Sequence, residues 1–134
     1  MTVREYLEFL LDLLLTVAPL RRDDAVIYRK EKKVFVRDPF ALRTFASWAG
    51  ASFLESALVE GIVQEHLYRR FGEVYYYRNH YEIDAVAGGL RVEVKTGKPH
   101  RRYPRGVNVL DEDSIPGFLV NLSASSGHVG PARK

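Results

Sequence analysis

The chain has 134 residues, a length that predicts one domain with at most a small appended element. Hydrophobic residues make up 46% of it and charged residues 28%, and the net charge of +3 is compatible with a nucleic-acid partner. Because there is no cysteine, disulfides, thiolate zinc sites and cysteine nucleophiles are excluded, and a metal ion would need oxygen or imidazole ligands.

A leucine-rich run near the N-terminus, residues 9–15, could suggest a signal peptide. The acids Glu5 and Glu8 precede it, Asp12 interrupts it, and it is far shorter than a membrane span. We therefore expect a cytoplasmic protein with no membrane partner. Asn, Gln and Met are scarce as well as Cys, which is typical of a thermophile.

The first 44 residues predict a partial winged-helix-like element. Thr2 and Glu5 have the spacing of a capping box, and leucines then recur at helical intervals, which predicts a helix over residues 3–17 that ends before Pro19. Two strand-like runs follow, residues 25–28 and 34–37, joined by a charged turn. A helix followed by a hairpin with a basic tip is typical of the second half of a winged helix.

Residues 45–122 predict an α/β core. Asp38 and Pro39 precede a short helix over residues 40–48, and a long helix is expected over residues 52–71, ended by Gly72. Strand-like runs follow, separated by short turns, at residues 74–78, 81–87, 90–96, 107–110 and 118–122. The end of the chain, residues 123–134, is rich in Ser and Gly and predicts a disordered tail.

The hairpin that is expected around the turn at residues 88–89 carries four charged residues close to one another. A two-residue turn there places Asp84 opposite Glu93 and Glu82 opposite Lys95, and alternation puts all four side chains on one face. Opposed like charges destabilise a sheet, and a divalent cation would compensate for them. Lys95 would then lie beside the ion, placed to orient an attacking water, as metal-assisted phosphodiester hydrolysis requires. The alternative is a solvated sheet face whose acids are relieved by Lys95 and Arg91.

The long helix offers a further acid. Glu60 shares its helical arc with apolar residues, a costly position unless the carboxylate is paired or metal-bound, so it is our candidate for a supporting ligand. An acid at the core margin paired with an arginine is the alternative. Glu65 points the same way as Arg69, which predicts a surface pair.

A basic loop follows the hairpin and is the candidate DNA-binding segment, with a solvated charged loop as the alternative. Its candidate residues are Lys98, Arg101, Arg102, Tyr103 and Arg105. The predicted wing tip, with Lys30, Lys32 and Lys33, is a second and weaker candidate. The tyrosines at residues 75–77 alternate along the strand, so we expect at least one side of it to pack on the core, and we do not interpret them as a platform for bases.

A glutamate in a helix, an aspartate on a strand and Glu-x-Lys on the next strand resemble the signature of the PD-(D/E)XK nuclease superfamily. More narrowly, the chain resembles the C-terminal region of archaeal and bacterial AAA-type ATPases, where a winged helix precedes a nuclease-like domain. The segments that carry the resemblance are residues 2–7, 33–38, 58–63, 76–78, 82–84 and 92–95. Ile83 stands where the signature has its proline, and the ATPase module is absent from this chain.

The resemblance implies a restriction-endonuclease-like core, a mixed central sheet flanked by helices. It implies that Asp84, Glu93 and Glu60 serve as ligands of Mg²⁺ or Mn²⁺ and that Lys95 is the catalytic lysine. The function that we expect is hydrolysis of DNA phosphodiester bonds by a metal-dependent endonuclease that works as a homodimer. The alternatives are a non-catalytic DNA-binding or regulatory module of a larger AAA-type ATPase, and a purely structural or dimerisation domain.

Overall fold

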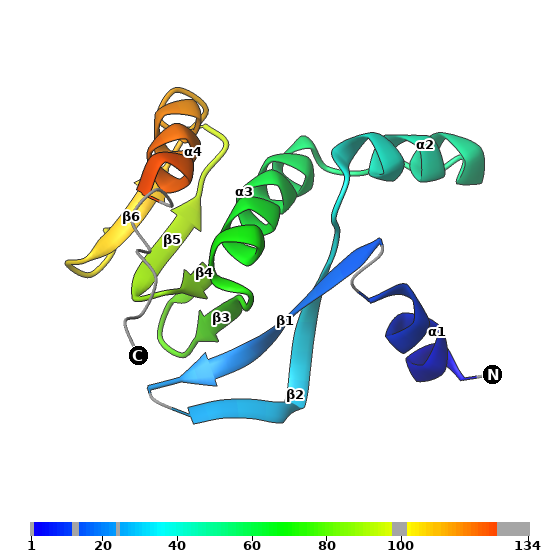
Figure 1. The fold of residues 1–134 in the computed structure, drawn as a ribbon, viewed down its shortest axis with the longest axis horizontal. Helices are drawn as coiled ribbons and strands as arrows, with labels where there is room; N and C mark the ends of the chain where they lie inside the picture. The colour runs from blue at the N-terminus through cyan, green and yellow to red at the C-terminus, as the bar shows by residue number, and fades with distance from the viewer. Residues whose placement is uncertain (1, 12–13, 24, 98–101, 126–134) are drawn as a thin grey trace, which may run out of the picture.

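The computed structural model describes residues 2–11, 14–23, 25–97 and 102–125. These ranges form an α/β fold in which a six-stranded mixed sheet, in the order β2-β1-β3-β4-β5-β6, is flanked by helices (Figure 1). The expected α/β class with a mixed central sheet is therefore confirmed. None of the helices in the described ranges combines the length and the apolar character needed to cross a bilayer.

The N-terminal elements differ from the prediction. Helix α1 spans Val3–Leu10 and strand β1 spans Leu15–Arg22, so the predicted helix over residues 3–17 is too long. Pro19 lies inside β1, where the register with β2 shifts, because proline has no N–H group to donate to the ladder. Thr16, Ala18 and Leu20 alternate along β1 as its buried side. The contacts of this strand thus override the local helical pattern.

Strand β2 spans Ala25–Val36 without interruption, so the predicted hairpin of two short strands is wrong. Its partner is β1, which it meets antiparallel along most of its length. The charged residues 29–33 lie within β2, and this edge strand tolerates them because one side of it borders solvent. Through the parallel pair Leu20 with Tyr76, residues 15–36 join the same sheet as the later strands.

Two helices connect the halves of the sheet. Helix α2 spans Pro39–Ala49, with Asp38 accepting a 2.8 Å hydrogen bond from the N–H of Phe40 as its N-cap. The predicted boundary between residues 44 and 45 falls inside this helix. Helix α3 spans Glu55–Phe71 and ends at Gly72, which takes the left-handed conformation with φ of 78°. Both predicted helices are confirmed, with the start of α3 three residues later than expected.

The strands that carry the candidate site follow α3: β3 (Tyr75–Arg78), β4 (Glu82–Ala87), β5 (Leu90–Val94) and β6 (Val107–Leu110). The predicted register of the β4–β5 hairpin is confirmed, since Ala87 pairs with Leu90 and Ala85 with Val92. Gly88 turns the hairpin with φ of 54°, and a Cβ atom there would overlap the ring of Phe71. Glycine is therefore favoured at this turn against the end of α3.

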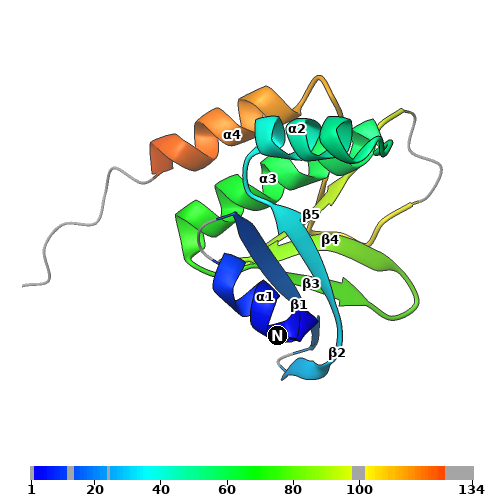
Figure 2. The same cartoon turned by 90° about the vertical axis from the view of Figure 1, so that its right-hand side faces the viewer.

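Helix α4 spans Ile115–Ala124, so the predicted strand over residues 118–122 is wrong. Ile115, Leu119 and Leu122 recur at helical spacing and pack on the main core. Helix α4 also includes the first two residues of the predicted disordered tail, and residues 126–134 lie outside the described ranges. Figure 2 shows α3 and α4 on one side of the strands, where the main core lies.

Candidate functional site

The β4–β5 hairpin opens at Asp84 and Glu93. Ala85 and Val92 form the last backbone pair of the ladder in this direction. Beyond them the N–H of Asp84 donates to Glu93 Oε2 at 3.1 Å, and the N–H of Val94 donates to Asp84 Oδ2 at 3.0 Å. The two carboxylates thus replace the next rung of the ladder, and both residues are buried. The predicted proximity of Asp84 and Glu93 is confirmed.

A buried amide holds the backbone at this opening. Gln64 of α3 is 2% exposed and donates through Nε2 to the carbonyl oxygen of Asp84 at 2.8 Å. Gln64 is not among the predicted site residues. Gln64 lies four residues after Glu60, about one turn along α3, and this spacing could have indicated that both side chains face the same site.

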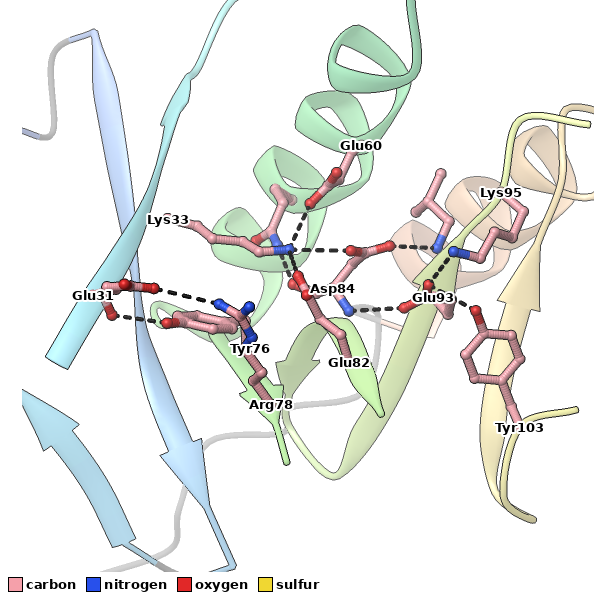
Figure 3. Close-up of polar contacts among 12 residues, drawn as sticks. Glu31, Lys33, Glu60, Tyr76, Arg78, Glu82, Asp84, Glu93, Lys95 and Tyr103 are labelled. Carbon is pink, nitrogen blue, oxygen red and sulfur yellow. Dashed lines mark hydrogen bonds and ion pairs between the residues drawn. The ribbon is translucent and has the colours of Figure 1, made fainter. Parts of the chain in front are cut away.

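Lys33 is the unexpected member of the site. Its Nζ lies 2.7 Å from Glu82 Oε1, 3.2 Å from Asp84 Oδ1 and 3.3 Å from Glu60 Oε1 (Figure 3). The sequence placed Lys33 at a wing tip. In the structure it points inward from β2, on the side of the strand that also carries Phe35, which packs on Ala18, Leu20 and Tyr76. Lys33 lies two residues before Phe35, and this strand spacing could have indicated that its side chain faces the core.

Lys95 and Tyr103 contact the other carboxylate. Lys95 Nζ lies 2.5 Å from Glu93 Oε1, and the hydroxyl of Tyr103 donates to the same oxygen at 3.0 Å. The predicted pairing of Lys95 with Glu82 is wrong. β5 ends at Val94, and the N–H of Lys95 donates to the carbonyl oxygen of Leu110 in β6, so a pair between Glu82 and Lys95 is not part of the β4–β5 ladder.

The site holds more negative charge than positive charge. Four carboxylates, those of Glu60, Glu82, Asp84 and Glu93, face two ammonium groups, which leaves a surplus of two negative charges. Burial raises the pKa of Glu60 to about 7, with the charge of Asp84 acting in the same direction and Lys33 opposing it. The protein thus relieves part of the surplus by holding a proton.

The other shifts follow the same charges. Burial raises the pKa of Glu93, while the hydrogen bond from Lys95 opposes the change. For Lys33, burial lowers the pKa, but the hydrogen bond to Glu82 and the charges of Glu60 and Asp84 outweigh it and the net pKa is raised. Both lysines keep their protons at neutral pH, because burial is outweighed in the same way at Lys95.

The predicted site residues Glu60, Asp84, Glu93 and Lys95 thus lie in one region of the fold. As the side chains stand, no three Asp, Glu or His residues of the described ranges form a group that could hold a metal ion. The ammonium group of Lys33 takes the position between three of the carboxylates.

The candidate DNA-binding loop is only partly described. Lys98 and Arg101 lie outside the described residues. Arg102 and Arg105 are exposed, whereas Tyr103 is half-buried and turned toward Glu93. Contact between this loop and DNA stays a prediction.

Glu65 forms a separate buried centre on α3. Arg37 donates to it through Nε and Nη2, each at 3.0 Å, and Arg69 donates at 2.6 Å. The predicted pair with Arg69 is confirmed, but its position at the surface is wrong, since Glu65 is 5% exposed. Burial raises the pKa of Glu65, yet the hydrogen bonds from both arginines outweigh it and hold the pKa below its usual value.

No family model matches this chain, and neither a curated protein nor a solved structure matches it.

Proposed function

We propose that this protein is a metal-dependent nuclease of the PD-(D/E)XK type, with a restriction-endonuclease-like core, that hydrolyses phosphodiester bonds of DNA. The observation that carries the proposal is the excess of four carboxylates over two ammonium groups where β4 and β5 separate, an excess that remains when Glu60 takes up a proton. Asp84 and Glu93 lie side by side there, and Lys95 contacts Glu93 at 2.5 Å. A divalent cation would neutralise this excess of negative charge.

The donor set fits a hard cation. Carboxylate oxygens are the ligands that Mg²⁺ and Mn²⁺ prefer, and Asp84, Glu93 and Glu60 would supply them. When bound, such an ion would neutralise charge on the scissile phosphate and lower the pKa of a water molecule. Lys33 supplies positive charge to Glu60, Glu82 and Asp84.

The surrounding residues position the site. Gln64 fixes the backbone of Asp84, and the N–H of Val94 fixes its carboxylate. Glu93 and the ring of Tyr103, 5.7 Å from Lys95 Nζ, hold that ammonium group at the opening of the hairpin. Lys95 is therefore placed to donate hydrogen bonds to a phosphate oxygen or to the attacking water.

The test is cleavage of DNA in the presence of Mn²⁺ by the variants Asp84→Asn and Lys95→Ala. Asparagine keeps an oxygen for the N–H of Val94 but removes the charge, so we expect a folded variant without activity. Glu112→Gln changes an exposed acid and is the matched control, which should cleave like the parent. Equal cleavage by Asp84→Asn and the parent, with equal thermal unfolding, would remove this site from consideration.

A second candidate is a non-catalytic DNA-binding or regulatory module related to a larger AAA-type ATPase. The position of Lys33 favours it, because an ammonium group among three carboxylates already gives them a cation. This candidate predicts that Mn²⁺ causes neither cleavage nor thermal stabilisation, while DNA binding weakens with salt.

We also propose that the nuclease acts as a homodimer, because two sites are needed to cut both strands of a duplex. Light scattering of the purified chain measures its oligomeric state directly. A monomer that nicks one strand would contradict the dimer and leave the assignment of the site intact.

A further inference from the structure

A hollow lies on the sheet close to the carboxylates. It has a volume of about 540 Å³, within the range of pockets that hold small organic ligands. Residues of β1, of the β3–β4 region and of the β4–β5 hairpin line it, chiefly Arg21, Asp23, Tyr77, Tyr81, Val86 and Arg91.

Aromatic rings and guanidinium groups dominate this hollow. The rings of Tyr77 and Tyr81 lie 5.1 Å apart between centroids and are tilted by 37°. Arg91 places Cζ 5.4 Å from the centroid of Tyr77 and donates through Nη2 to the hydroxyl of Tyr81 at 3.3 Å. The two tyrosines and Arg91 are therefore one contiguous group of half-buried side chains.

The arginines of the hollow have no carboxylate partner within the described ranges. Neither Arg21 nor Arg91 is among the ion pairs there, whereas Arg37 and Arg69 share Glu65. Arg21 donates to the carbonyl oxygen of Asp23 at 3.3 Å and places Cζ 5.6 Å from the centroid of the Tyr75 ring, and neither contact supplies a carboxylate. With Asp23 as the single acid of the lining, the hollow is positively charged and suited to an anion.

The hollow borders the carboxylate site along β5. Arg91 is two residues from Glu93 on this strand, and Val92 between them packs on the core. Residues two apart on a strand face the same way and are separated by about 7 Å. A chain lying in the hollow would therefore need to extend only a short distance to reach Asp84 and Glu93.

We propose that this hollow binds a nucleotide unit of single-stranded DNA. Tyr77 and Tyr81 offer ring faces for an unpaired base, and Arg21 and Arg91 offer charges for its phosphate. A base within a duplex is stacked on both sides and cannot present its face to these rings, so the hollow takes an unpaired nucleotide, such as one beside the duplex that a dimer would cut. The link to cleavage rests on the proposed nuclease function, but the binding itself does not.

The experiment measures binding of a short fluorescein-labelled oligothymidylate by fluorescence anisotropy in EDTA, where a metal-dependent reaction cannot proceed. We expect Arg91→Ala and Tyr81→Leu each to weaken the Kd by about tenfold. Arg91→Lys retains the charge without the planar group, so it should weaken binding less and gives a second variant should alanine disturb the fold. The control Arg43→Ala, an exposed arginine of α2, should stay within about twofold of the parent.

Competing ligands show whether the hollow recognises the base, the phosphate or both. An oligomer of abasic sites should bind the parent and Tyr81→Leu equally, because it has no base to stack. Unlabelled single strand should compete better than duplex of the same sequence, and better than free thymidine monophosphate. Equal competition by duplex, or a parental Kd for both Arg91→Ala and Tyr81→Leu, would overturn the inference. Parental binding without any cleavage would instead overturn the nuclease and leave the hollow as a single-strand site.

Discussion

Helix α3 carries two glutamates five residues apart that meet opposite conditions. Glu65 is held by two arginines, Arg37 and Arg69, and its pKa is held below the usual value because their hydrogen bonds outweigh its burial. Glu60 shares one lysine, Lys33, with two other carboxylates, and burial raises its pKa to about 7. One centre has enough cations for its acid and the other does not.

The difference separates a structural centre from a candidate functional one. A buried acid with two cations gains nothing from a further positive charge. A buried set of acids with too few cations is costly for the fold on its own, and it binds a proton or a metal ion more readily for that reason. Four substitutions test whether this distinction between the two centres holds.

The largest expected loss of stability comes from Arg37→Met. Methionine keeps much of the packing of the side chain but leaves buried Glu65 with Arg69, whose side chain is 70% exposed. Removing one partner of a buried ion pair should lower the free energy of unfolding by about 3 kcal/mol, measured by urea denaturation. A loss of under about 1 kcal/mol would show that the Glu65 centre is not structural.

Lys33→Met probes the other centre and should cost about 2 kcal/mol in EDTA, since three carboxylates lose their shared cation. Mn²⁺ should then raise the melting temperature of the variant more than that of the parent, because the ion takes over the role of the lysine. Lys32→Met, at an exposed neighbour on β2, is the control and should change neither quantity. No effect of Mn²⁺ on the Lys33 variant would mean that both centres are structural.

Glu60→Gln should change how stability depends on pH. The folded parent holds a proton on Glu60 that the unfolded chain releases, so the free energy of unfolding falls as the pH rises from about 4.5 through about 7. The glutamine variant lacks this fall and should be more stable than the parent by about 2 kcal/mol at pH near 8, in EDTA. Glu55→Gln, at an exposed acid of the same helix, should follow the parent at every pH. Parallel curves for parent and Glu60→Gln would contradict the raised pKa.

The smallest effect is expected for Arg69→Ala. Because this side chain is largely exposed, its pair with Glu65 should contribute about 0.5 to 1 kcal/mol, to be compared with Arg37→Met in the same urea titration. A loss as large as that of Arg37→Met would show that burial of the cation does not decide the strength of this centre.

The parts of the site that depend on nearby residues could be predicted from the sequence. Gly88 and Gly89 both take positive φ, as a tight two-residue turn requires, and the turn alone determines which residues of β4 and β5 face each other. The helical spacing of the apolar residues in α3 likewise identified Glu60 as an acid that faces the core. Each inference needed fewer than about twenty residues of sequence, over which helical and strand periodicities hold.

The parts of the site that depend on distant residues could not be predicted from the sequence. Lys33 reaches Asp84 only because β2 pairs with β1 and β1 with β3, and none of these pairings has a local signal. The run from Phe118 to Leu122 is apolar at nearly every position, so its period does not distinguish a strand from a helix packed on the core. Contact with α3 and the sheet decides in favour of the helix.

The sequence separations within the carboxylate site have a consequence for the order of folding. Asp84 contacts Glu93 and Val94, nine and ten residues away, whereas Lys33 comes from 51 residues away. Because short-range contacts close sooner, the hairpin should bring its acids together before β2 delivers the lysine. The last step of assembly is then the one that neutralises the site. We expect β2 to be the strand whose amide hydrogens exchange first in the native protein, with the hairpin still intact.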